Sequence, residues 1–154
     1  MPTLADWVPD LDEILSAIYR RVNPDATMTA LLGGSNRVIA SPSAPPRSPL
    51  PRLNIWIINV AVDPENMTAR VLCAGRARAK NPNLGTVEDR ETLGNICQRL
   101  GQLVVGVHDA QPFSDANYRF MDSWLEAGFG PMTDEEAPEE GWQEQRFVLR
   151  CHRL

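Results

Sequence analysis

The sequence lacks several features that would indicate a particular class of protein. Its 154 residues contain only two histidines and three cysteines, and acids outnumber bases by 20 to 15. The net charge of −5 disfavours a dedicated nucleic-acid-binding protein, because such proteins normally carry a basic excess. No apolar run approaches the roughly 18 residues that cross a bilayer, and the start, MPTLADWVPDLDE, lacks the basic-then-apolar pattern of a secretion signal. We therefore expect a protein that is made in the cytoplasm and is not embedded in a membrane.

The three cysteines, Cys73, Cys97 and Cys151, show no Cys-x-x-Cys spacing. An odd number without that spacing argues against a disulfide framework and against a zinc site. Residues of this kind in a cytoplasmic protein are usually reduced, small and buried. We expect the same here.

Catalytic motifs are also scarce. His108-Asp109 resembles a base with an orienting acid, but no serine or cysteine nucleophile motif accompanies it. A histidine at the C-terminal end of a helix is the more ordinary interpretation. Gly33-Gly34 is not followed by the lysine and serine or threonine of a phosphate-binding loop. We expect no enzyme activity, no cofactor and no metal site.

What is present begins with two helices in residues 10–33. Asp10 can act as an N-cap with Glu13 three residues on, and apolar residues at helical spacing follow. Asn23-Pro24 ends this helix, since the residue before proline avoids the α region. Asp25 can cap a second, shorter helix, which Gly33-Gly34 ends because glycine readily takes the left-handed conformation.

A proline-rich arm, residues 41–51, separates these helices from an apolar strand. SPSAPPRSPLP holds five prolines between Pro42 and Pro51, which predicts an extended, polyproline-like segment. The strand Leu53–Val62 follows and is apolar on both faces, which predicts that both faces are covered. One face carries Ile55 and Ile57, and the other carries Trp56, Ile58 and Val60.

The strand Ala69–Lys80 alternates. Small residues occupy one face and a basic row, which we define as Arg70, Arg76, Arg78 and Lys80, occupies the other. Such a row is ordinarily a solvated strand face. The alternatives are a surface that docks an acidic partner, or the lining of a passage for nucleic acid.

The helix from Thr86 to Val107 has the strongest apolar periodicity in the sequence, which predicts a core helix. Gly94 and Gly101 lie on it, and we expect them to allow close packing on a sheet. Two strands follow, Asn117–Leu125 and Trp142–Arg153. Between them, residues 133–141 form an acidic loop that we expect to be long and mobile; its acids include Glu135, Glu136, Glu139 and Glu140.

This order of elements indicates an α+β fold. We expect a single domain, residues 1–154, with a mostly antiparallel sheet of four to five strands and helices packed on one face.

The set of segments resembles the tail terminator, or tail-completion, proteins of long-tailed bacteriophages. The matching segments are the helix DLDEILSAIYRRV, the junction ATMTALLGGSNRVI, the strand PRLNIWII, the basic strand, the helix RETLGNICQRLGQLV and the final QRFVLRCHRL. The resemblance covers roughly residues 10–154. The arm is longer and richer in proline than the family pattern.

The resemblance implies a structural virion protein in the neck, at the top of the tail. It implies a homohexameric ring that caps the tail tube, ends its polymerisation and joins the tail to the head connector. Its partners would be other copies of itself, the tail-tube protein and a connector or head-closure protein, with DNA only passing through the channel. Another neck component, such as a head-closure or minor tail protein, remains an alternative, and a small α+β enzyme is a further one.

Two groups of residues are candidates for contacts in such a ring. We expect the first group at subunit interfaces: Pro42, Pro45, Pro46, Arg47, Pro49, Leu50, Trp56 and Ile58. We expect the second group to dock a partner or to face the channel: the basic row together with Glu135, Glu136, Glu139 and Glu140.

Overall fold

Five strands and three helices make up the part of the chain that the computed structural model describes, residues 9–45, 47–80, 87–105 and 117–154. The helices are α1 (Leu11–Val22), α2 (Ala26–Leu32) and α3 (Val87–Val105). The strands are β1 (Val38–Ile39), β2 (Arg52–Asp63), β3 (Thr68–Lys80), β4 (Tyr118–Thr133) and β5 (Glu140–Arg153). The predicted order of elements is confirmed.

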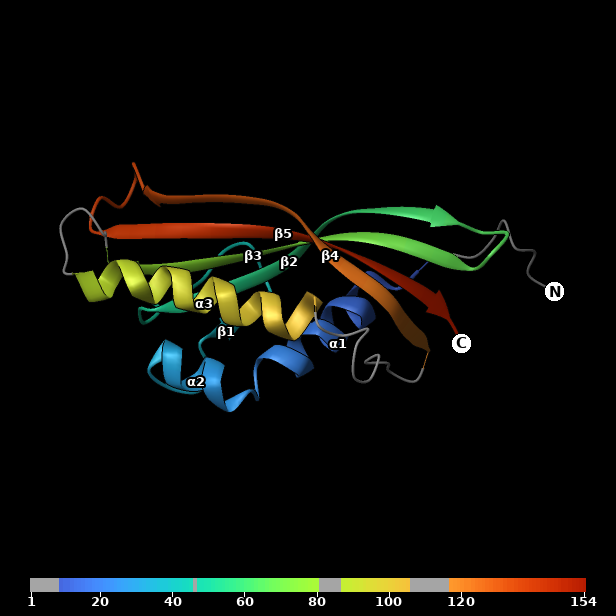
Figure 1. The fold of residues 1–154 in the computed structure, drawn as a ribbon, viewed down its shortest axis with the longest axis horizontal. Helices are drawn as coiled ribbons and strands as arrows, with labels where there is room; N and C mark the ends of the chain where they lie inside the picture. Colours follow the sequence, from blue (N-terminus) through green and yellow to red (C-terminus); the bar gives the residue numbers. More distant parts are fainter. Residues whose placement is uncertain (1–8, 46, 81–86, 106–116) are drawn as a thin grey trace.

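The strands form one twisted sheet in the order β1-β2-β3-β5-β4, and the helices lie together on one side of it (Figure 1). The α+β class and the placement of the helices are therefore confirmed. The sheet is mixed, however, because β1 runs parallel to β2 while the other neighbours are antiparallel.

The core lies between the sheet and the helices. Its buried side chains come from one face of β3 and β5 and from the apolar stripe of α3, which includes Leu93, Ile96, Leu100 and Val104. Gly75 allows the close approach of helix to sheet, since a Cβ at this position would collide with Leu100. The expected role of Gly94 and Gly101 is wrong: among the described residues, a Cβ at Gly94 would meet no atom within 4 Å, and one at Gly101 only Gln145 Oε1 at 4.0 Å.

Asp10 caps α1 as predicted, accepting hydrogen bonds from the backbone N–H groups of Asp12 (3.1 Å) and Glu13 (3.2 Å). The reciprocal half of the capping box is replaced by tertiary contacts. The Asp10 N–H donates to the Tyr118 hydroxyl (2.7 Å), and the Glu13 carboxylate accepts from Asn117 (2.7 Å). These contacts fasten the start of α1 to the start of β4.

Asp25 caps α2 through the Met28 N–H (2.8 Å), and Gly33 ends the helix with φ 75°. The Asp25 carboxylate also accepts from Arg99 on α3 at 2.6 and 2.9 Å. These hydrogen bonds lower the pKa of Asp25 against the opposing effect of burial. One residue therefore serves both as a cap and as the link between α2 and α3.

Strand β2 contains a β-bulge, because its register with β3 shifts between Ile57 and Asn59. An extra residue reverses the alternation of side chains beyond it. Val60 consequently pairs with buried Val71 and packs against the core, on the same side as Ile57. The expectation that Val60 shares a face with Trp56 is wrong for this reason.

The β4–β5 hairpin is longer than predicted, and its loop is shorter, covering residues 134–139. The Asp134 N–H donates to the Glu140 carbonyl (3.1 Å), which closes the turn.

Among the described helices, none is long and apolar enough to cross a membrane.

Candidate assembly surface

The sheet has a second face, opposite the helices, which we call the open face. On β3 the helix side carries Val71, Cys73, Gly75, Ala77 and Ala79, so the basic row lies on the open face. The register places the alternate residues of β5 and β4 beside it. The open face consists mainly of arginines, aromatic rings and carboxylates.

Glu144 on β5 is the centre of this face. Its carboxylate accepts from Arg76 Nε and Nη2, at 2.9 and 2.8 Å, and from Arg146 Nε at 2.9 Å. The Glu144 residue is only 1% exposed. A buried carboxylate costs free energy unless it is paired and hydrogen-bonded, and here two guanidinium groups satisfy it.

Aromatic rings complete the cover over this cluster. Arg76 lies over Trp142 at 4.2 Å and over Trp56 at 5.7 Å, and Arg146 lies over Phe129 at 4.8 Å, each measured to the ring centroid. Guanidinium groups stack favourably on aromatic faces. Side chains of the sheet itself therefore shield Glu144, on a face where no described helix packs.

A second ion-pair cluster lies where the β4–β5 hairpin turns. Arg78 donates to Asp134 (2.7 Å) and contacts Glu140 (3.4 Å), and Arg52 lies 3.5 Å from Glu140. The hydrogen bond from Arg78 lowers the pKa of Asp134, against the opposing effect of burial. This hairpin tip, residues 132–139, is thereby held against β3 and β2.

The opposite end of the open face holds two neighbouring arginines and the carboxylates Asp122 and Glu126. Arg70 and Arg150 are direct cross-strand partners, and Asp122 pairs with Arg150 at 2.9 Å. Arg70 lies over Trp124 at 5.7 Å. Beside them is a hollow of about 240 Å³, lined by Asn59, Ala61, Arg70, Leu72, Trp124, Glu126 and Val148. We call this region the basic end.

The proline-rich arm is the connection between two parallel strands. Parallel neighbours cannot be joined by a tight hairpin and need a crossover of about a dozen residues, which accounts for its length. Ser48 donates to the Pro45 carbonyl from its N–H (3.2 Å) and from its hydroxyl (2.6 Å), and Arg47 has φ 63°. The chain therefore turns here, and the prediction of an extended, polyproline-like segment is wrong for these residues.

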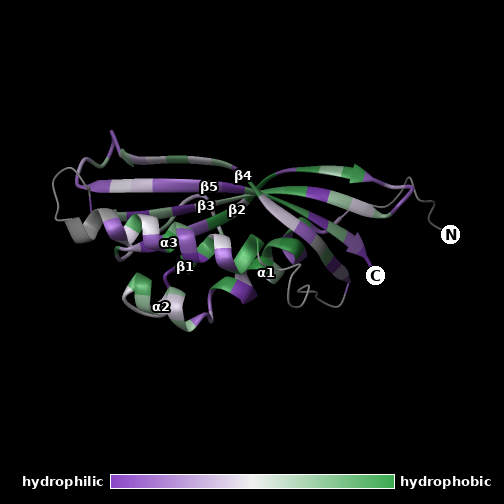
Figure 2. Cartoon of the chain, viewed as in Figure 1, coloured by the Kyte–Doolittle hydropathy of each residue, from purple (hydrophilic) through white to green (hydrophobic). Residues whose placement is uncertain are grey.

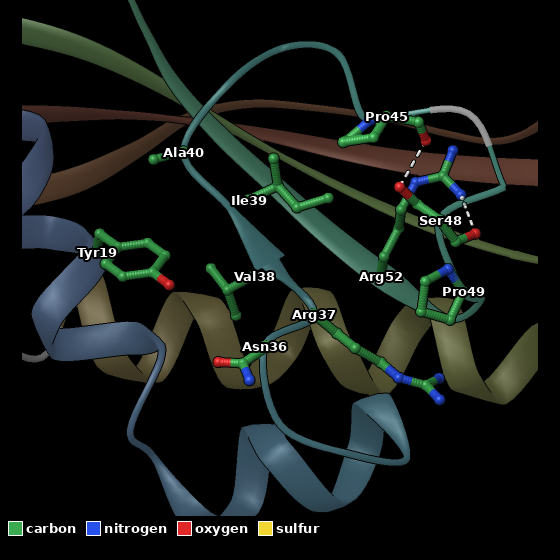
Figure 3. A pocket seen from close by; sticks show the side chains of 10 residues that line it. All are labelled: Tyr19, Asn36, Arg37, Val38, Ile39, Ala40, Pro45, Ser48, Pro49 and Arg52. Atoms are coloured by element: carbon green, nitrogen blue, oxygen red, sulfur yellow. Dashed lines mark hydrogen bonds between the residues drawn. The ribbon is translucent and has the colours of Figure 1, made fainter.

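The arm encloses a cavity of about 420 Å³ against β1 (Figure 3). Arg37, which lines it, donates to the Leu32 and Leu50 carbonyls at 2.8 and 2.9 Å, so its guanidinium holds the arm in place. Among described residues the lining includes no carboxylate, histidine or cysteine. The groups expected of a catalytic pocket do not converge there.

The predicted interface residues lie in two places. On the arm, Pro42, Pro45, Arg47 and Pro49 are exposed and Leu50 is half-buried, while Pro46 lies outside the described residues. Trp56 is part of the open face, and Ile58 is exposed at the bulge. The structure thus separates the arm from the two strand residues.

The predicted docking residues fall into two groups, those that form ion pairs within the chain and those that are exposed on the surface. Arg76, Arg78 and Glu140 form ion pairs within the chain. The others are exposed on the described surface: Arg70, Lys80, Glu135, Glu136 and Glu139. Sequence reasoning missed Glu144, although its alternation with Trp142 and Arg146 in WQEQR is a strand signal that places all three on one face.

Other candidate chemistry is limited. Burial raises the pKa of the Cys73 and Cys97 thiols to about 12, which keeps them protonated and unreactive. Cys151 is buried and His152 is half-exposed on the other face, as the alternation predicts. Across the described ranges, no three histidine, cysteine, aspartate or glutamate side chains could hold a metal ion. His108-Asp109 lies outside those ranges.

The fold and the open face define an α+β domain with an exposed sheet surface of arginines, aromatic rings and carboxylates. No protein-family model matches the chain, and no curated protein matches it. Among solved structures, a chain from the virion of a native gene transfer agent particle matches with a TM-score of 0.67 and 15% identity. The match covers 94% of this chain and 98% of the other. The two chains therefore share a fold almost from end to end.

Proposed function

We propose that this chain is a structural virion protein of the tail terminator type. In this proposal it forms a homohexameric ring on the last ring of tail-tube protein, ends polymerisation of the tube, and joins the tail to the head connector. The observation that carries the proposal is the whole-length fold match to a virion chain. The resemblance of the sequence segments to tail terminators supports the specific role.

Exposed apolar side chains on the edge strand β4, and on β2 beyond the two residues that pair with β1, support self-assembly. Of the exposed large hydrophobic residues in the described ranges, most lie on β2 or β4: Ile58, Val62, Leu125, Phe129 and Met132. Figure 2 shows the outer part of β2 as mostly hydrophobic, whereas β5 beside the hairpin tip is hydrophilic. Exposed apolar edges favour pairing with another chain, so a ring that covers them would gain stability.

The proposed location is the neck of a virion, at the top of the tail, after assembly in a host cytoplasm. The partners are other copies of the chain, the tail-tube protein and a connector or head-closure protein, and DNA only passes through the channel. The role requires no enzyme activity. The exposed arm residues remain interface candidates in this proposal.

The first test is the oligomeric state. Native mass spectrometry of the purified chain should show a species of six times the 17.1 kDa chain mass. A protein that stays monomeric at every concentration would contradict the ring.

The second test separates a terminator from another neck component. Virions assembled without this protein should contain tubes of uncontrolled length, visible by electron microscopy, because nothing ends polymerisation. Tails of normal length that fail to join heads would instead indicate a head-closure protein. Normal, joined particles would exclude both roles.

A further inference from the structure

The two ends of the open face differ in their exposed charged groups. At the hairpin tip, Glu135, Glu136 and Glu139 are exposed, and no ion pair to any of them is found in the described part of the chain. Asp134 and Glu140 differ, because Arg78 and Arg52 already pair with them. The tip therefore presents uncompensated negative charge.

The basic end holds a like-charged pair. Arg70 and Arg150 face each other directly across β3 and β5, an arrangement that is destabilising when like charges lie opposite. Asp122 accepts from Arg150 only, and one of its oxygens, Oδ1, is buried without a hydrogen bond. Glu126 lines the same hollow as Arg70, but no ion pair between them is found among the described residues, so an added acid that pairs with Arg70 would relieve the repulsion between the two arginines.

The two ends are also complementary in their apolar surfaces. Met132 at the tip is 50% exposed and Phe129 beside it is 41% exposed. The hollow at the basic end is lined mostly by apolar side chains, including Leu72, Trp124 and Val148. An exposed methionine suits a shallow apolar hollow, because its unbranched side chain adapts to irregular surfaces.

The tip cannot reach the basic end of its own chain. Glu140 and Arg150 are ten positions apart on β5, and a strand rises about 3.4 Å per residue, so the two ends are separated by about 34 Å of hydrogen-bonded sheet. The hairpin lies at the far end of the long axis from the beginning of β3 (Figure 1). Contact between these surfaces must therefore join two molecules.

We propose that the hairpin tip of one copy docks on the basic end of the next. Met132 enters the hollow, and Glu135 and Glu136 pair with Arg70 and Arg150. The contact uses different surfaces on the two copies, so it is head-to-tail and can close into a ring. The proposal rests on the proposed function for its ring, and it assigns the surfaces that hold the ring together.

Charge reversal with complementation tests this docking. One variant carries Arg70→Glu and Arg150→Glu, and the other carries Glu135→Lys and Glu136→Lys. Each alone should raise the protein concentration needed for ring formation at least tenfold, measured by mass photometry at low salt. An equimolar mixture should restore assembly, because in a ring of alternating variants half of the contacts are wild-type pairs and the other half are reversed pairs, and all of them join opposite charges.

A chain that carries all four substitutions provides the decisive measurement. Every contact in its ring is a reversed but complementary pair, so it should assemble close to the wild-type concentration. Arg20→Glu and Glu91→Lys are the matched controls, because they reverse exposed charges on α1 and α3, on the other side of the sheet from the two docking surfaces. Urea unfolding midpoints of all variants establish that the subunit remains folded.

The outcomes separate this docking from the ring itself. Wild-type rings with unaffected reversal variants would overturn the docking and leave the ring standing. Weakened assembly that the fourfold variant does not restore would also overturn it. Intact variant rings that no longer join tails or heads would show that another virion protein occupies the basic end. A monomeric wild type would contradict the ring and the docking together.

Discussion

The two faces of β3 are formed by alternating residues of one strand and are stabilised in different ways. On the helix side, small residues let α3 approach so closely that Gly75 lies directly under Leu100. On the open side, long basic residues extend over neighbouring strands and are held by carboxylates and aromatic rings. The first face is stabilised by apolar packing, and the second by a polar network at the surface.

This difference indicates which face of the sheet stabilises the subunit and which face is available for assembly. Burial of apolar surface is the dominant favourable contribution to folding, so the helix face should hold most of the stability of the subunit. The open face retains charge and exposed apolar edges, which are the features that a second molecule can use. Substitutions on the two faces should therefore differ both in size and in what they affect.

The largest effect is expected from the centre of the helix face. Leu100→Ala should lower the free energy of unfolding by about 2–5 kcal/mol, because it removes buried methyl groups and leaves a cavity. A urea titration measures the change. An effect near zero would show that α3 contributes little to the core.

The two glycines should respond in opposite directions. Gly75→Ala should destabilise the subunit by about 1–3 kcal/mol, since the new methyl group forces Leu100 to move. Gly94→Ala should stabilise it by up to about 1 kcal/mol, because alanine is the better helix former and the position is open. Thermal unfolding of the pair measures both, and equal shifts in the same direction would contradict the packing described.

The open face has its own most sensitive position. Glu144→Gln should cost about 1.5–3 kcal/mol, since it weakens hydrogen bonds to two guanidinium groups around a buried site. The matched control is Glu139→Gln on the exposed tip, which should change stability by less than about 0.5 kcal/mol. If the two variants unfold at the same urea concentration, the Glu144 cluster does not stabilise the sheet.

The smallest effect on stability is expected from the ion pair between Asp25 and Arg99, and this effect depends on pH. The pKa of Asp25 is lowered in the folded protein by Arg99, so its contribution to stability is present above the unfolded pKa of about 4 and is lost as pH falls through the folded value. Asp25→Asn keeps a capping side chain and should cost no more than about 1 kcal/mol at neutral pH. The difference from wild type should shrink below pH about 4 in urea titrations. A constant difference across that range would contradict the ion pair.

Local patterns predicted much of this molecule. Asp10, Asp25 and Gly33 mark the helix ends, since caps depend on residues close in sequence. The alternation in β3 and the stripe of α3 assigned buried and exposed sides correctly, because side-chain direction follows the period of the element. Element order then predicted the α+β class and the single layer of helices.

Register and partner choice required the tertiary structure. The bulge at Ile57/Asn59 turns Val60 toward the core. The local sequence NVAV, residues 59–62, contains no pattern that predicts this bulge. Gly75 rather than Gly94 is the close-approach glycine because that depends on which strand lies under α3. For the candidate surface, the sequence by itself supplied the basic row and the acidic tip. Only the sheet decided that Arg76 and Arg78 form ion pairs within the chain while Arg70 faces Arg150, because ion pairing depends on distances between strands that are far apart in sequence.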